Sequence, residues 1–137
     1  AYDMWIGLVG SEICIRDSRN VAKASLVCMM AGADFIKTST GKESINANLN
    51  NSLVMLRMIR DFYTKTGKKI GFKPAGGIST AKSVLEFLIL VAEELGFEWV
   101  NPKLLRIGAS SLLIDIERQL YHYTSGRYAN KEKLAIG

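Results

Sequence analysis

Short apolar runs alternate with long amphipathic runs along this chain, and no other feature of the sequence constrains the fold as strongly. The apolar runs are predicted strands: residues 5–10 (WIGLVG), 33–37 (ADFIK), 69–73 (KIGFK) and 104–108 (LLRIG). Apolar residues at helical spacing follow each of them and predict helices at residues 18–32, 48–67, 79–96 and 110–126. Strands and helices in strict alternation predict an α/β fold, with a parallel sheet and helices packed outside it.

Residues with capping preferences mark the expected helix ends. Ser18 is predicted to cap the first helix, and either Ser79 or Thr80 the third. Glycines are predicted to end the helices: Gly32, Gly67, Gly96 and Gly126. No low-complexity linker separates these elements, so residues 1–137 are predicted to form a single domain.

Two arrangements of such a sheet compete: an open doubly wound sheet, and part of a (β/α)8 barrel. The pattern G-x-G-x-x-G does not follow the first predicted strand, which weighs against a dinucleotide-binding fold. A complete barrel needs about 250 residues. This chain has 137 residues, enough for one domain with a core, and would supply roughly half of a barrel.

The composition excludes several classes of protein. Cys14 and Cys28 make no disulfide framework, and no Cys/His cluster suggests a metal site. The net charge of +5 is spread out and no basic run interleaves with aromatic residues, so we expect no nucleic-acid partner. No apolar run reaches the length of a membrane span, and the N-terminus lacks the basic region of a signal peptide. These features favour a reduced, cytoplasmic protein, with residues 127–137 as a flexible tail.

Two lysines end consecutive predicted strands. Lys37 follows the apolar pair Phe35-Ile36, and Lys73 ends the next strand. Sites in parallel α/β folds lie at the carboxyl ends of strands, and neighbouring strands lie about 4.8 Å apart. If both side chains point inward, burial and the like charge of Lys73 should lower the pKa of Lys37. A neutral lysine amine attacks carbonyl carbons and forms a Schiff base. Alternatively, one or both side chains extend to solvent and have no chemical role.

Small and hydroxyl residues follow the same strand ends. They form a candidate phosphate site: Lys42, Gly76, Gly77, Gly108, Ser110 and Ser111. Glycine loops allow backbone N–H groups to approach an anion, and a helix N-terminus favours negative charge. The alternative is that these residues are ordinary turn glycines and helix caps.

Other candidate residues are weaker. Residues 39–44 (STGKES) are not a P-loop, because Ile36 stands where the first glycine belongs and Glu43 replaces the required Ser/Thr. His122 lies between two tyrosines on a predicted helix and is interpreted as a surface or packing residue. The isolated acids are not predicted to be catalytic: Glu12, Asp17, Asp34 and Asp115.

Three segments carry a resemblance to a known family. Residues 32–42 (GADFIKTSTGK), 71–78 (GFKPAGGI) and 106–113 (RIGASSLL) closely resemble the signature segments of the deoxyribose-phosphate aldolase family, which are class I aldolases with TIM-barrel folds. The resemblance runs from about Lys23 to about Tyr128. It implies the carboxyl-terminal half of a (β/α)8 TIM barrel, with about the last four βα units in this chain.

The resemblance also implies an activity, a lyase reaction. The expected reaction is reversible cleavage of 2-deoxyribose 5-phosphate to glyceraldehyde 3-phosphate and acetaldehyde, without metal or organic cofactor. By position, Lys37 matches the Schiff-base lysine, and Lys73 the second lysine, which perturbs the first and takes part in proton transfer. Gly76, Gly77, Ser110, Ser111 and Lys42 match the phosphate-binding region.

The chain departs from the family pattern near both ends. Residues 4–20 match it only loosely, the family's catalytic aspartate belongs to an earlier strand, and the chain ends without the tyrosine found in some members. We therefore expect a homo-oligomer or association with a first half of the barrel, and weak activity of residues 1–137 alone. Two alternatives remain: another Schiff-base barrel aldolase or transaldolase, and a non-catalytic half barrel that binds phosphate or a partner protein.

Overall fold

The computed structural model describes residues 3–5, 15–39 and 47–130. Its elements follow one another in the order β1 (Asp3–Trp5), α1 (Ile15–Met30), β2 (Phe35–Lys37), α2 (Leu49–Thr66), β3 (Gly71–Lys73), α3 (Ala81–Leu95), the 3-10 helix η1 (Phe97–Trp99) and α4 (Leu112–Ser125). Helices form in all four regions where the sequence predicts them, because each region combines helical apolar spacing with a terminal glycine.

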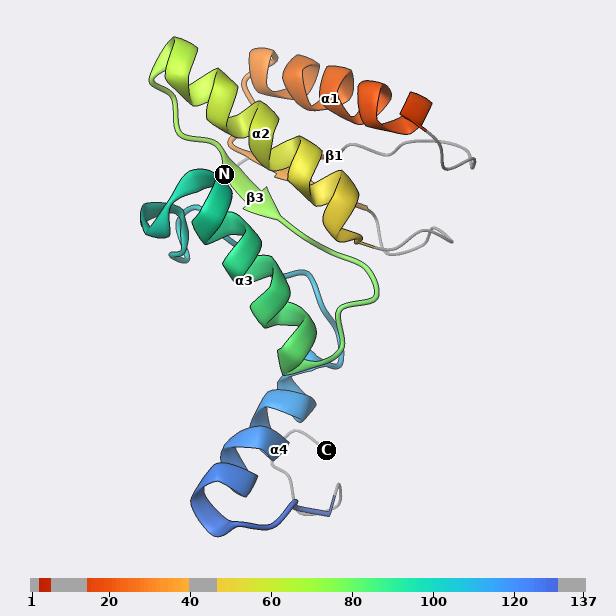
Figure 1. Cartoon of the computed structure of the whole chain (residues 1–137), viewed down its shortest axis with the longest axis vertical. Helices are drawn as coiled ribbons and strands as arrows, with labels where there is room; N and C mark the ends of the chain where they lie inside the picture. The colour runs from red at the N-terminus through yellow and green to blue at the C-terminus, as the bar shows by residue number, and fades with distance from the viewer. Residues whose placement is uncertain (1–2, 6–14, 40–46, 131–137) are drawn as a thin grey trace.

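The sheet grows in one direction along the chain. Its strands are parallel and lie in the order β1-β2-β3, so each strand is a neighbour of the next. A doubly wound sheet instead reverses its direction of growth at a switch point. In Figure 1, α1, α2 and α3 lie on one side of the strands. Sequential parallel strands with helices on one face are the arrangement of a partial (β/α)8 barrel, as predicted.

Residues 104–108 lie parallel beside β3 but form no regular strand, so the prediction of a fourth strand is wrong in this respect. The ladder is reduced to two isolated bridges, Phe72 to Leu105 and Ala75 to Gly108. Pro74 lies between the two bridges and has no N–H, so the hydrogen bond that would join them cannot form. Its carbonyl oxygen still accepts from the amide of Gly108 at 2.8 Å.

Two predicted boundaries at the start of the chain also differ from the structure. β1 covers Asp3–Trp5, whereas the sequence predicts a strand at residues 5–10, of which 6–10 lie outside the described residues. The helix α1 begins at Ile15, ahead of Ser18, so the predicted cap at Ser18 is wrong. Serine is only mildly unfavourable inside a helix, so its capping preference does not force a helix to begin there. The predicted caps Thr80 and Gly67 are confirmed at the ends of α3 and α2.

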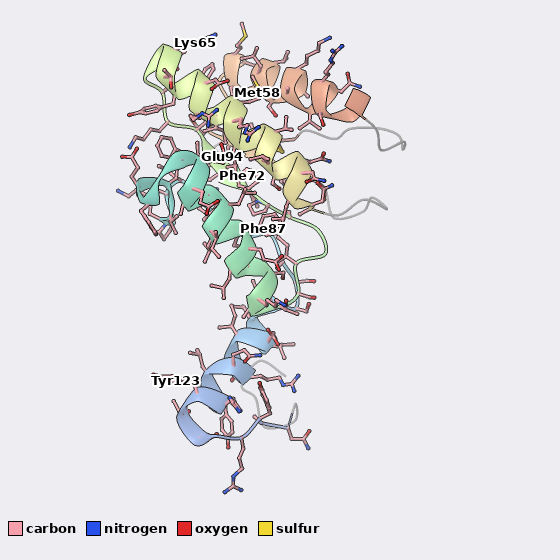
Figure 2. All side chains as sticks on the ribbon, viewed as in Figure 1. Met58, Lys65, Phe72, Phe87, Glu94 and Tyr123 are labelled. Atoms are coloured by element: carbon pink, nitrogen blue, oxygen red, sulfur yellow. The ribbon has the colours of Figure 1, made fainter. Side chains whose placement is uncertain are left out.

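The hydrophobic core lies between the sheet and its helices. Its buried residues come from the strands, from all three covering helices and from η1: Ile36, Ile70, Phe72, Leu105, Val21, Met29, Met55, Leu56, Ile59, Val91 and Trp99. Phe72, labelled in Figure 2, lies where α2 and α3 approach the sheet. Successive strand residues face opposite sides. The residues that alternate with the core residues therefore face away from the helices, toward what would be the interior of a barrel.

Phe35 and Gly71 form a close contact on this inner face. They are register partners in β2 and β3, and a Cβ on Gly71 would overlap the Phe35 ring. The guanidinium carbon of Arg106 lies 4.1 Å from the centroid of the same ring. Gly71 therefore leaves the space in which the ring and the guanidinium stack.

Replacing Gly71 by alanine should destabilise the fold by about 1–3 kcal/mol, because the added methyl group overpacks a buried ring. The midpoint of urea unfolding measures the loss. Phe35→Leu in the same chain removes the overlapping ring atoms, so the double variant should lose less stability than the sum of the two single variants. Strictly additive losses would show that the ring moves aside at no cost.

The far end of β3 is closed by η1, which the sequence did not predict. Trp99 is buried, and its indole N–H donates to the carbonyl oxygen of Ile70 at 3.0 Å. Its ring meets that of Tyr63 edge-on, with centroids 5.1 Å apart. These contacts fix the amino end of β3, opposite the end at which Lys73 lies.

The helix α4 begins beside the start of α3 and extends away from the sheet (Figure 1). Tyr123, near its far end in Figure 2, is 88% exposed. His122 stacks on Tyr128 with ring centroids 4.2 Å apart, in agreement with a packing role for the histidine. This contact holds part of the predicted tail against α4, and residues 131–137 of that tail lie outside the described residues.

Candidate active site

The structure brings the two predicted lysines together. Lys37 and Lys73 are the last residues of β2 and β3 and are direct register partners. Both side chains are partly buried, and both lie on the face away from the helices. Residues paired in this way have Cα atoms about 4.8 Å apart, so the two amines share one small region at the carboxyl edge of the sheet.

A third cation continues this row, and the sequence reasoning did not single it out. The bridge between Phe72 and Leu105 places Arg106 next to Lys73, and the Arg106 amide donates to the Phe72 carbonyl oxygen at 3.1 Å. Lys37, Lys73 and Arg106 therefore form one transverse row on the inner face. The signal was present in the sequence, because Arg106 follows the apolar Leu105 just as Lys73 follows the apolar Phe72.

The residues directly after Lys37 join the ends of β2 and β3. The Thr38 hydroxyl donates to the Ala75 carbonyl oxygen at 3.0 Å and accepts from the Ala75 amide at 2.9 Å. The buried Ser39 hydroxyl donates to the same Ala75 carbonyl oxygen at 2.9 Å. The Thr38 amide donates to the carbonyl oxygen of Lys73 at 3.2 Å. Thr38 and Ser39 thus hold the lysine of one strand in register with that of the next.

Replacing Thr38 by valine should therefore destabilise the fold by about 1–3 kcal/mol, because two hydrogen bonds are lost and the Ala75 amide is left without its partner. Valine keeps the shape of threonine and removes its hydroxyl. Thr38→Ser retains the hydroxyl and should keep most of the stability. The midpoint of urea unfolding checks this, and equal midpoints for both variants would contradict it.

The loops predicted to bind phosphate also lie side by side. Gly76 and Gly77 have φ values of 97° and 73°, a left-handed conformation that glycine adopts without strain. Gly108 lies against Ala75, and a Cβ on Gly108 would come within 2.6 Å of the Ala75 Cβ. Only glycine lets the two loops approach so closely.

Ser110 and Ser111 complete this group at the start of α4. Both are exposed, and Ser111 is the N-cap residue of the helix but makes no capping hydrogen bond through its side chain. Lys42 lies outside the described residues, although Ala47, beyond it, donates through its amide to the Gly76 carbonyl oxygen at 3.0 Å. Two glycine-bearing loops and one helix N-terminus therefore converge near the lysine pair.

A metal-binding cluster and a membrane-spanning helix are both absent from the part of the chain that the structure describes. Among those residues, no group of three or more His, Cys, Asp or Glu side chains could hold a metal ion. None of the helices in the same ranges is long and apolar enough to cross a membrane.

Known proteins show the same combination of segments. The sequence pattern of the family described as DeoC/LacD family aldolase matches residues 8–113. The chain belongs to this aldolase family. The match contains both lysines and both glycine loops, so the site lies within the part of the aldolase pattern that this chain carries.

Curated relatives of this aldolase chain carry a more specific name. The chain is 70% identical over 110 residues to the deoxyribose-phosphate aldolase of Mus musculus, and 67% identical over 110 residues to that of Homo sapiens. Each alignment covers 80% of this chain and 35% of the relative. The chain thus spans about a third of the length of these aldolases.

A solved structure supports the fold independently. A crystal structure of a Toxoplasma gondii protein with a provisional deoxyribose-phosphate aldolase name matches with a TM-score of 0.71 and 20% identity. The match covers 88% of this aldolase chain and 44% of the Toxoplasma chain. At 20% identity the comparison shows the barrel-type fold and says nothing about the reaction.

Proposed function

We propose that this chain supplies the Schiff-base lysine and the phosphate loops of a deoxyribose-phosphate aldolase. The substrate would be 2-deoxyribose 5-phosphate, and the products glyceraldehyde 3-phosphate and acetaldehyde. The observation that carries the proposal is the register pairing of Lys37 with Lys73 at the carboxyl edge of the sheet, beside two glycine loops. The names of the mouse and human relatives support the choice of substrate.

The proposed reaction begins at Lys37. Its neutral amine attacks the C1 aldehyde of the open-chain sugar, and loss of water gives a protonated imine. A base removes the C3 hydroxyl proton, C3 becomes the carbonyl carbon of the released glyceraldehyde 3-phosphate, and the C2–C3 bond breaks. The electron pair of that bond forms the C1=C2 double bond, and the pair of the C=N bond moves to the imine nitrogen. The resulting enamine takes a proton at C2, and water then releases acetaldehyde from Lys37.

Lys73 is the proton-transfer group in this proposal. It is the register partner of Lys37 on the next strand, so its amine is near enough to exchange protons with groups bound to Lys37, which is the role of a general acid–base catalyst. Phe35 and Ile36, both buried, make the approach to Lys37 apolar.

The substrate phosphate would bind between the Gly76-Gly77 loop and the start of α4. Backbone amides of the glycine loop can approach an anion closely, and the N-terminus of α4 carries partial positive charge. We further propose that the working protein is cytoplasmic, and that it is a homo-oligomer or associates with a segment that completes the barrel. Association would supply the remaining wall of a barrel around the inner face, which carries Lys37, Lys73 and Arg106.

The test is acetaldehyde release from 2-deoxyribose 5-phosphate by the full-length protein, with residues 1–137 alone measured beside it. We expect steady turnover by the full-length protein and weak turnover by the shorter chain. Ribose 5-phosphate serves as the control sugar, because cleavage there would release a hydroxylated aldehyde instead of acetaldehyde. Borohydride trapping without cleavage of deoxyribose 5-phosphate would favour another Schiff-base aldolase, and phosphate binding without trapping would favour a non-catalytic barrel.

A further inference from the structure

One carboxylate joins the two helices that follow the phosphate loops. Asp115 lies in the first turn of α4, and its Oδ2 accepts a hydrogen bond of 2.8 Å from the amide of Ala81, the first residue of α3. The contact is partly buried and links residues 34 positions apart in the chain. The sequence alone predicts only that Asp115 is an isolated acid and not a catalytic one.

This bond is the second of two hydrogen bonds that join the two loops of the proposed phosphate site. On the strand side, the amide of Gly108 donates to the Pro74 carbonyl oxygen at 2.8 Å, which fixes the two loops where they leave the sheet. On the helix side, Asp115 fixes them where they enter α3 and α4. Figure 1 shows that α4 otherwise extends away from the sheet, so this bond is placed to hold its N-terminus beside the glycine loop.

The N-termini of α3 and α4 differ in the side chains that accept hydrogen bonds from their first-turn amides. In α3, Thr80 accepts from the Ser83 amide at 3.2 Å and Asp115 accepts from that of Ala81. In α4, Ser111 makes no capping hydrogen bond through its side chain. Two first-turn amides of α3 therefore have side-chain acceptors, which makes the start of α4 the better place for the phosphate.

The charge of Asp115 and its hydrogen bond act in opposite directions. Asp115 follows Ser111 by four residues, a rise of about 6 Å along a helix, so its negative charge repels a nearby phosphate. Its hydrogen bond, in contrast, keeps the two loops together. Substitutions that separate charge from hydrogen bonding can therefore distinguish the two effects.

We infer that Asp115 is a positioning residue that sets the spacing of the two phosphate loops, and thereby the preference of the enzyme for phosphorylated over unphosphorylated deoxyribose. The inference rests on the proposed function, because it assigns a specificity role within the same site. Asp115 acts through the backbone of the two loops and does not itself touch the substrate.

The experiment compares Asp115→Ala and Asp115→Asn in the full-length protein, with deoxyribose 5-phosphate and unphosphorylated deoxyribose as substrates. Alanine removes the acceptor, and we expect KM for the phosphorylated sugar to rise by about tenfold, the effect of one lost hydrogen bond to a charged group, with little change for the unphosphorylated sugar. Asparagine keeps an acceptor oxygen without the charge, so its KM for the phosphorylated sugar should equal or fall below that of the parent. Ser111→Glu, which puts a negative charge at the start of α4, is the reference for a blocked site.

Equal losses with both sugars, or equal KM values for the alanine and asparagine variants, would overturn the inference. Calorimetric titration with inorganic phosphate keeps this result separate from the proposed function, because it needs no turnover. If the parent protein cleaves neither sugar but phosphate affinity falls for Asp115→Ala and is kept for Asp115→Asn, the positioning role stands and the aldolase proposal fails. Unchanged phosphate affinity in Asp115→Ala would overturn the positioning role itself.

Discussion

Replacing Lys37 by methionine should reduce cleavage of deoxyribose 5-phosphate by roughly 10⁴-fold or more, since enzymes commonly accelerate reactions by 10⁶-fold or more and the proposed route has no other nucleophile. Methionine keeps an unbranched side chain of similar length but has no amine. Because Lys37 is only partly buried at a strand end, the fold should tolerate the change.

Borohydride reduction of the protein in the presence of acetaldehyde gives the direct measurement. Peptide mass analysis should find the added ethyl group on Lys37 in the parent protein and on no peptide in the methionine variant. Lys65→Met is the matched control, because Lys65 is exposed in the last turn of α2, and the chain after this turn leads to the amino end of β3, opposite the end at which Lys73 lies. A label on Lys73 or Lys42 would show that the nucleophile has been assigned to the wrong residue.

Replacing Lys73 by leucine should slow the reaction by about 10²–10⁴-fold, the usual effect of losing a general acid–base group. Leucine has no amine, so no group at this position of β3 can exchange protons with groups bound to Lys37 on the neighbouring strand.

Lys73→Arg separates the charge of Lys73 from its capacity to transfer protons. Arginine preserves the positive charge but does not give up its proton, so the steady-state rate should fall about as far as in the leucine variant. Turnover by the arginine variant at the rate of the parent would show that Lys73 does not transfer protons in the reaction.

The pairing of Lys37 with Lys73 could be predicted from the sequence because it depends on few assumptions. Consecutive strands joined by a helix are neighbours in most parallel sheets, and the two lysines hold the same place in FIK and GFK. The glycines at positions 76, 77 and 108 could also be predicted as site residues, since they stand at or shortly after the end of a predicted strand. Each of these features is local in the sequence, and the regular pairing of β2 with β3 brings the residues together in space.

The hydrogen bonds that hold the site together could not be predicted in the same way. Thr38 contacts Ala75 across 37 positions, and Asp115 contacts Ala81 across 34. No periodicity relates such partners, because their meeting depends on how loops turn after leaving the sheet. The break in the ladder at Pro74 belongs to a different class, since a proline after an apolar strand already indicates a missing donor.

Trp99 gives the protein an internal optical reporter at the end of β3 that is remote from the lysines. Its indole is 1% exposed and hydrogen-bonded to the Ile70 carbonyl oxygen, so its fluorescence should shift to longer wavelength when that end of the sheet opens to water. Trp5 is the only other tryptophan in the chain, and Trp5→Phe would leave a single emitter. In that background, the emission spectrum of residues 1–137 reports whether the core around Trp99 is folded, independently of any activity measurement. A variant that loses activity with an unchanged emission spectrum therefore has an altered site and an intact core.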